Sequence, residues 1–170
     1  MDKTNLRIWA KDKRKELDME NISTILVNKL VQTQEYKKSK NVMIFYPMPD
    51  EVNLLSLLND NAKNFYLPRI NGKELECCPY KNDDELCESC FHTLEPTCAS
   101  CSKTNLDMVI VPALACDKNN FRLGYGGGFY DRFLKNFSGI TTVCIPKELI
   151  TDTIYPEEHD IKVDLIITNS

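Results

Sequence analysis

Apolar residues near the start of the chain recur at the spacing of an α-helix. Over residues 3–17, Leu6, Ala10 and Leu17 form a rough apolar face, which predicts a first helix. A similar spacing predicts a second helix over residues 22–34. We expect the second helix to belong to the scaffold, because its inward side is apolar throughout.

Short apolar runs further along the chain predict strands. They cover residues 41–46, 65–68, 74–79, 106–112, 140–145 and 163–167. A further helix is predicted from Asp50 to Leu58, because acidic residues suit the first turn of a helix. Residues 80–105 break the pattern with polar, cysteine-rich sequence. Strands and helices that alternate at these lengths are typical of an α/β fold with a mostly parallel sheet, and we expect a single domain over residues 1–170.

Glycines gather between the predicted strand at residues 106–112 and an amphipathic turn at residues 129–134. Four of the six glycines in the chain lie here, at Gly124, Gly126, Gly127 and Gly128. A strand, a glycine loop and the start of a helix together form an arrangement that binds phosphate, because backbone N–H groups converge on the anion. Arg122 and Arg132 flank the loop as candidate phosphate ligands, and Asp131 is a candidate Mg²⁺ ligand. The alternative is a tight turn that needs positive φ angles, since the spacing matches neither the dinucleotide fingerprint nor the Walker loop.

The charge is unevenly distributed. Residues 1–40 carry ten Lys and Arg against six Asp and Glu, a net of +4, and residues 41–170 carry 11 against 19, a net of −8. Four basic residues of the first predicted helix form one stripe: Lys3, Arg7, Lys11 and Arg14. Such a stripe is usually a solvated helix face, although it can also hold a small phosphorylated ligand. A chain with a net charge of −4 is a poor candidate for nucleic-acid binding.

Composition is that of an ordinary globular protein, with 42% hydrophobic and 27% charged residues. The longest apolar run is too short to span a membrane and the N-terminus is charged, so we expect a cytoplasmic protein without membrane contact. Eight cysteines are then more consistent with thiols or metal ligands than with disulfides. Two Cys-x2-Cys pairs, Cys87 with Cys90 and Cys98 with Cys101, can supply four thiolates to a structural zinc ion. Their separation is shorter than that of zinc ribbons, which favours a reduced surface loop instead.

Several motifs in order resemble the 5-formyltetrahydrofolate cyclo-ligase family, also called methenyltetrahydrofolate synthetase. The most specific is Arg122-Leu-Gly-x-Gly-x-Gly-x-Tyr-Asp131. The others are Lys3-x-x-Leu6-Arg7, Asp50-Glu51, Leu67-Pro68-Arg69, Glu95-Pro96, residues 107–112 and His159-Asp160. The resemblance implies a three-layer, Rossmann-like α/β fold whose mostly parallel central sheet has helices on both faces. It also implies an ATP- and Mg²⁺-dependent cyclisation of 5-formyltetrahydrofolate to 5,10-methenyltetrahydrofolate, ADP and phosphate.

The resemblance also implies roles for individual residues. ATP would be bound by Lys3, Arg7, Arg122, Gly124, Tyr125, Gly126, Gly127, Gly128, Phe129 and Tyr130. The folate would contact Tyr46, Glu51, Phe91, Tyr125 and Phe129, with Glu51 accepting N–H hydrogen bonds from the pterin. Mg²⁺ would be held by Asp131 and Asp160, and the catalytic residues would be Arg122, Tyr130 and Asp131. Lys11 and Arg14, the rest of the basic stripe, would stay in solvent.

The implied chemistry accounts for these residue types. A formamide oxygen is a poor leaving group, so ATP phosphorylates it first, and N10 then attacks the activated carbon and expels phosphate. The protein's part in phosphoryl transfer is mainly positioning and charge stabilisation. We expect a monomer whose partner is this small substrate. Two other interpretations remain open: a nucleotide- or folate-binding regulator without chemistry, and an interaction protein built around a zinc-bound cysteine segment.

Overall fold

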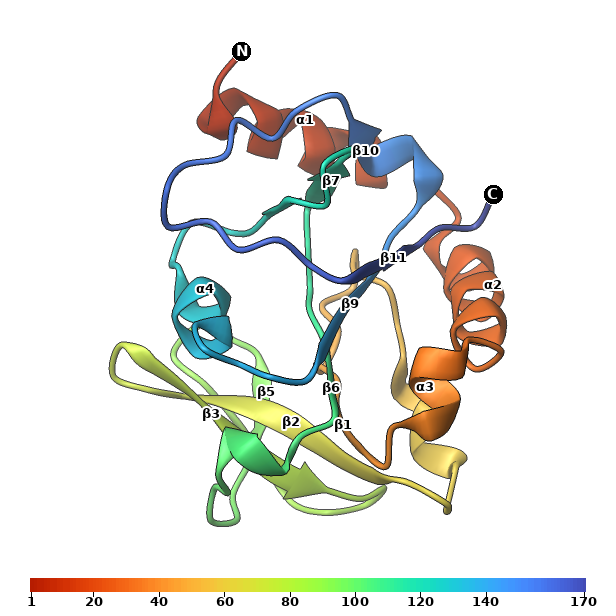
Figure 1. Ribbon diagram of the computed structural model, residues 1–170, viewed down its shortest axis with the longest axis vertical. Helices are drawn as coiled ribbons and strands as arrows, with labels where there is room; N and C mark the ends of the chain where they lie inside the picture. Colours follow the sequence, from red (N-terminus) through yellow and green to blue (C-terminus); the bar gives the residue numbers. More distant parts are fainter.

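The computed structural model describes all residues from Met1 to Ser170 and is built around a six-stranded sheet (Figure 1). Its strands lie in the order β11-β9-β6-β1-β2-β3. Their bounds are β1 Asn41–Met43, β2 Asn64–Asn71, β3 Glu74–Tyr80, β6 Met108–Ile110, β9 Ile140–Cys144 and β11 Leu165–Ile167. Every neighbouring pair is parallel except β2 with β3, which is antiparallel. The prediction of a mostly parallel sheet is confirmed.

Helices cover both faces of this sheet. Helices α1 (Lys3–Arg14) and α4 (Phe129–Leu134) pack on one face, and α2 (Met19–Leu30) and α3 (Gln34–Lys38) pack on the other. The alternation of side chains along each strand divides the core into two clusters. Met43 of β1 joins the α1 and α4 cluster, whereas its neighbour Val42 joins the α2 and α3 cluster. The three-layer arrangement is therefore confirmed.

Two smaller sheets extend this core. Strands β10 (Ile150–Thr151), β7 (Ala115–Asp117) and β8 (Arg122–Leu123) form one, in that order. Strands β4 (Leu86–Glu88) and β5 (Leu94–Pro96) form an antiparallel hairpin within the segment that the sequence pattern left without structure. Single 3₁₀ turns occupy Leu55–Asn59, Lys103–Asn105 and Lys147–Leu149.

The helix predicted from Asp50 to Leu58 is wrong. Glu51 closes a turn instead, because its carboxylate accepts a hydrogen bond from the Met48 N–H at 2.8 Å. The Asn53 side chain likewise accepts from the Leu55 N–H at 2.9 Å, and helical geometry begins only at Leu55, as a 3₁₀ turn. Val52 and other apolar residues of the segment are buried as expected. Their burial was therefore predicted correctly, but the conformation of their backbone was not.

Helix ends also differ from the prediction. The first helix ends at Arg14, and the second begins at Met19, where the Asp18 side chain caps it by accepting from the Asn21 N–H. The second helix stops at Leu30, and Thr33 then caps the separate helix α3. Apolar spacing alone therefore predicted one helix over residues 22–34, whereas the Thr33 cap begins a separate helix within that range.

The cysteines of the zinc hypothesis are divided between two parts of the molecule. Cys87 lies on β4 and Cys90 follows it towards the hairpin turn, whereas Cys101 pairs with β3, its Sγ 3.5 Å from that of Cys77. Cys98 donates to the Pro79 carbonyl at 3.3 Å. The four thiols do not converge as ligands for one ion. All eight cysteines are free thiols.

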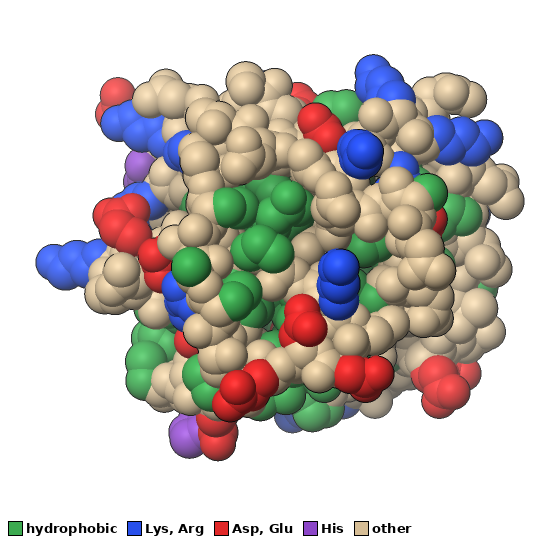
Figure 2. Space-filling model, turned by 90° about the horizontal axis from the view of Figure 1, so that it is seen from below, with side chains coloured by type: hydrophobic (Ala, Val, Ile, Leu, Met, Phe, Trp, Pro, Cys, Tyr) green, Lys and Arg blue, Asp and Glu red, His purple; other side chains and the backbone are tan.

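The outer surface carries charges of both signs. Figure 2 views one face, on which apolar side chains gather around a hollow near the middle and charged side chains stand around it. None of the helices combines the length and hydropathy that a membrane crossing needs.

The packing of α2 on the sheet should account for much of the stability. Leu26 is completely buried, so Leu26→Ala should lower the free energy of unfolding by about 2–5 kcal/mol, through lost burial and the cavity left behind. Ile8→Ala is the matched control, because Ile8 on α1 is 55% exposed, and it should change stability by less than about 0.5 kcal/mol. Urea denaturation measures both, and equal effects of the two substitutions would contradict this packing.

Candidate functional site

A cavity of about 740 Å³ lies where the chain leaves the parallel strands. Phe45 and Tyr46 follow β1, Pro112 follows β6, and all three line the cavity. Ligands of open α/β sheets bind at this edge. All of the site residues implied by the family resemblance line it: Lys3, Arg7, Tyr46, Glu51, Phe91, Arg122, Gly124, Tyr125, Gly126, Gly127, Gly128, Phe129, Tyr130, Asp131 and Asp160. The prediction of Arg132 as a phosphate ligand is wrong, because its guanidinium lies outside the cavity and donates to the carbonyls of Lys73 and Gly127.

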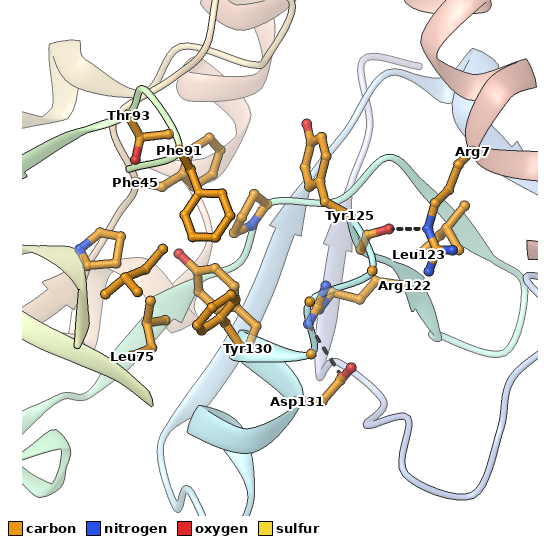
Figure 3. Close-up of a pocket in the computed structure, with 18 of the residues that line it drawn as sticks. Arg7, Phe45, Leu75, Phe91, Thr93, Arg122, Leu123, Tyr125, Tyr130 and Asp131 are labelled. Carbon is orange, nitrogen blue, oxygen red and sulfur yellow. Dashed lines mark hydrogen bonds and ion pairs between the residues drawn. The ribbon is translucent and has the colours of Figure 1, made fainter. Parts of the chain in front are cut away.

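The cavity has two chemically different walls (Figure 3). Arg7, Arg122 and Asp131 lie on one side of the view, whereas Phe91 and Leu75 lie on the other. We call the first the basic wall, formed by α1, the glycine loop and residues 157–160, and the second the apolar wall, formed by β2, β3 and the β4–β5 hairpin. A ligand that fills the cavity must be charged at one end and largely apolar at the other.

The glycine loop adopts backbone angles that only glycine takes easily. Gly126 has φ +108° and Gly128 has φ +70°. The loop is tied to α1, because the Arg7 Nε donates to the Gly124 carbonyl at 2.9 Å. A Cβ at Gly124 would lie 2.8 Å from Nη1 of Arg122, so a side chain here would displace that guanidinium. The glycines therefore serve both the turn and the close approach of an arginine.

Arg122 places a buried cation beneath the loop. Its side chain is 5% exposed, and its one ion pair is the long contact from Nη2 to Oδ1 of Asp131 at 3.4 Å. Its Nε has no hydrogen-bond partner, and its guanidinium carbon lies 5.6 Å from the centre of the Tyr130 ring. Burial lowers the pKa of Arg122, although arginine remains a cation under any ordinary condition. A buried guanidinium with so few partners is well suited to an incoming anion.

Lys3 connects the two ends of the chain at the cavity. Its ammonium lies 2.5 Å from Oδ2 of Asp160 and 3.2 Å from Oε1 of Glu157. Burial alone would raise the pKa of Asp160, but hydrogen bonds from Lys3 and from the Glu157 N–H outweigh it and leave the pKa below its ordinary value. Asp160 is therefore ionised at neutral pH.

Three side chains at this end form a candidate cation site. Ligand atoms of Asp131, His159 and Asp160 lie within 4.8 Å of one another. The two aspartates were predicted from the sequence as metal ligands, whereas His159 was not. Its position next to Asp160 in the same motif was the available signal.

Glu51 is a buried carboxylate that also lines the cavity. Its Oε1 accepts from the Met48 N–H at 2.8 Å, and its Oε2 accepts from the Tyr125 hydroxyl at 3.2 Å. Burial raises the pKa of Glu51, while the two hydrogen bonds and the nearby charge of Arg14 act in the opposite direction. This carboxylate can accept hydrogen bonds from a ligand's N–H groups.

Aromatic rings complete the apolar wall. The Phe91 and Phe129 rings meet edge to face, with centroids 6.1 Å apart and an interplanar angle of 73°. Phe91 lies near the hairpin turn and is 55% exposed, and it points towards Tyr130 across the cavity (Figure 3). Burial raises the pKa of Tyr130, so its hydroxyl keeps its proton at neutral pH.

Arg14 differs from the prediction that it stays in solvent. It is 4% exposed, and its guanidinium donates to the carbonyls of Asp50 at 3.1 Å, Leu114 at 3.3 Å and Ala113. Lys11 is exposed as expected. Arg14 is buried because it follows Ala10 by four residues, and so lies on the apolar face of α1.

Proteins of known function resemble this chain over nearly its whole length. The family model that describes the 5-formyltetrahydrofolate cyclo-ligase family matches residues 3–169. The mouse (Mus musculus) 5-formyltetrahydrofolate cyclo-ligase is 27% identical over 187 residues, covering 97% of this chain and 92% of that protein. The relative named a probable 5-formyltetrahydrofolate cyclo-ligase in Schizosaccharomyces pombe is 24% identical, covering 89% of this chain and 85% of that protein.

Solved structures agree with this similarity. The NMR structure of Aquifex aeolicus 5,10-methenyltetrahydrofolate synthetase has a TM-score of 0.86 and 29% identity, covering 99% of this chain and 90% of that one. The structure of a 5,10-methenyltetrahydrofolate synthetase from Mycoplasma pneumoniae has a TM-score of 0.81 and 22% identity, with complete coverage of both chains. Because its sequence identity is only 22%, the similarity to this second structure supports the fold alone.

The burial of Glu51 predicts a pH-dependent difference in stability. Because its pKa in the folded protein lies above its ordinary value of 4.5, its favourable contribution is complete below that value and is lost as the pH rises through the folded pKa. Glu51→Gln removes this titration but keeps an acceptor for the Met48 N–H. Urea unfolding of both proteins at pH 4 and pH 7.5 should show the variant gaining stability relative to the wild type at the higher pH. A difference that is the same at both pH values would contradict the raised pKa.

Proposed function

The chain belongs to the 5-formyltetrahydrofolate cyclo-ligase family and is therefore a ligase, and we propose that it cyclises 5-formyltetrahydrofolate to 5,10-methenyltetrahydrofolate at the expense of ATP. ADP and phosphate are the other products, and a phosphorylated formyl group is the intermediate. The observation that carries this proposal is the two-walled cavity, which a basic wall, an apolar wall and the buried Glu51 carboxylate line together.

ATP binds at the basic wall. Lys3, Arg7 and Arg122 supply three cations around the glycine loop, and the loop residues Gly124 to Tyr130 contribute main-chain N–H groups. Helix α4 has only six residues, so we assign the attraction for phosphate to the cations more than to a helix dipole. Lys3 exchanges its contact with Asp160 and Glu157 for a phosphate oxygen when the nucleotide binds.

The donor set at the end of the basic wall fits Mg²⁺. Asp131 and Asp160 offer the carboxylate oxygens that this ion prefers, and both line the cavity beside Arg122. His159 is the third group close enough to contribute, directly or through water. When bound, the ion would neutralise charge on the phosphates.

The folate binds at the apolar wall and Glu51. The Glu51 carboxylate accepts N–H hydrogen bonds from the pterin ring, and Tyr125 holds that carboxylate in place. Tyr46, Phe91 and Phe129 provide the surface on which the rings of the substrate pack. This placement directs the formyl group of the substrate towards the glycine loop.

The reaction then needs only local movements of charge. The formyl oxygen attacks the γ-phosphorus of ATP, and Arg122 stabilises the charge that develops on the transferred group. Asp131 holds the Arg122 guanidinium through its ion pair, and the protonated Tyr130 hydroxyl donates a hydrogen bond within the cavity. N10 attacks the activated carbon, the ring closes and phosphate leaves towards the basic wall.

We further propose that the enzyme acts as a cytoplasmic monomer. Both walls of the cavity are built from a single chain. The free state of all eight thiols is in keeping with a reducing compartment.

The purified protein should convert 5-formyltetrahydrofolate and Mg-ATP to 5,10-methenyltetrahydrofolate, with one ADP released per product. Absorbance of the methenyl product and an ADP assay, run in parallel, measure the two yields. Omission of ATP is the control and should abolish product formation. Ligand binding without ADP release would favour the regulator interpretation instead.

Arg7 should act mainly on ATP, because it contacts the glycine loop from α1. Arg7→Ala should raise the KM for ATP about tenfold or more, the scale of one lost charged hydrogen bond, and leave the KM for the folate nearly unchanged. Lys11→Ala, one helical turn further and exposed, is the matched control and should alter neither constant. A change in the KM for the folate alone would contradict the assignment of Arg7 to the nucleotide.

A further inference from the structure

Glu95 is a second buried carboxylate in the cavity, on the apolar wall. It lies in the middle of β5, is 8% exposed and lines the cavity with its strand neighbours Thr93 and Leu94. Its Oε2 accepts from the Ile70 N–H of β2 at 2.8 Å, which fixes the side chain between two strands. Its Oε1 has no protein hydrogen-bond donor and is not enclosed by protein atoms. One oxygen is therefore anchored, and the other is free for a ligand.

Every other carboxylate that lines the cavity is already engaged by a cation or a hydroxyl. Asp131 contacts Arg122, and Asp160 and Glu157 both contact Lys3. Glu51 accepts from the Tyr125 hydroxyl and from a main-chain N–H. Glu95 has neither kind of partner. The nearest arginine on β2, Arg69, pairs with Glu76 instead.

A carboxylate in this position needs a functional reason. Burying a charge without a cation is unfavourable, so such a group is rarely retained for stability alone. Tyr130, which also lines the cavity, keeps its proton at neutral pH because burial raises its pKa, so it does not serve as a base. Glu95 is thus the one carboxylate of the cavity that neither a cation nor a hydroxyl engages.

We propose that Glu95 is the general base of ring closure and removes the proton from N10. The proposal rests on the proposed function, since it requires the phosphorylated formyl group as the intermediate. The N10 lone pair forms the new N–C bond, and the N10 proton passes to Oε1 of Glu95. The C–O bond to phosphate breaks with its electron pair on the leaving oxygen, and the N5 lone pair completes the C=N bond of the amidinium product.

The location of Glu95 suits this step. The leaving phosphate belongs with Lys3, Arg7 and Arg122 on the basic wall, whereas the N–H of the attacking nitrogen has to be deprotonated away from those cations. Glu95 lies on the apolar wall, on the hairpin that also carries Phe91. A proton acceptor there stays separate from the phosphate charges.

Glu95→Gln tests the proposal, because glutamine keeps an acceptor for the Ile70 N–H but is unable to take a proton. Formation of the methenyl product should fall by roughly 10²–10⁴-fold. Phosphoryl transfer should persist, so positional isotope exchange in ATP labelled at the β,γ-bridge should stay within a few-fold of the wild-type rate. ADP released per methenyl product should rise well above one, as water hydrolyses the stalled intermediate. Glu88→Gln, an exposed position on the same hairpin, is the matched control and should leave all three quantities unchanged.

The outcomes separate this inference from the proposed function. A folded Glu95→Gln protein with wild-type product formation would overturn the inference alone. Equal loss of product formation and of isotope exchange would also overturn the inference, because such a loss would indicate that Glu95 has a structural role. A wild-type protein that makes no product would overturn the proposed function and the inference with it. Should Glu95→Gln fail to fold, Glu95→Asp keeps the carboxylate but withdraws it by one methylene, and the same rise in ADP per product is expected.

Discussion

The guanidinium of Arg122 beneath the glycine loop is the interaction on which the rest of the site depends. It is buried, has one long ion pair with Asp131 and leaves its Nε without a partner. Desolvating a cation in this way is unfavourable by itself, so its neighbourhood is shaped to keep it in place. Gly124 makes room for it, and the small sheet β10-β7-β8 fixes the strand from which it projects. The basic wall of the cavity is built around this one buried charge.

The other end of the cavity follows from the edge of the main sheet. Strand β3 runs antiparallel to β2, and the β4–β5 hairpin lies against both, so this edge forms a second wall opposite the glycine loop. The two buried carboxylates of the cavity, Glu51 and Glu95, differ in their partners. Glu51 is held by a hydroxyl and a main-chain N–H, whereas Glu95 is held by a main-chain N–H alone. The same residue type is therefore held in two different ways within one cavity.

Elements with a local sequence signature could be predicted from the sequence. Most positions that depend on contacts between distant residues could not. The strand, glycine loop and short helix around Gly124 to Leu134 have a local signature, and so do the core strands. The segment after Asp50 is an exception, because a local contact decided it: the Glu51 carboxylate accepts from the Met48 N–H three residues earlier and closes a turn in place of the predicted helix. Arg14 was misplaced because its partners, the carbonyls of Ala113 and Leu114, lie about a hundred residues away. The place of Glu95 was equally hidden, since its anchor is a main-chain group on another strand.

The contact between Lys3 and Asp160 joins positions that are 157 residues apart. A contact of such long sequence separation forms only after the intervening chain has closed into a loop, which costs conformational entropy. Helix α1 can form early, but the basic wall is incomplete until residues 157–160 have reached it. The basic wall is therefore a late product of folding, and its presence reports that segments 157 residues apart have met.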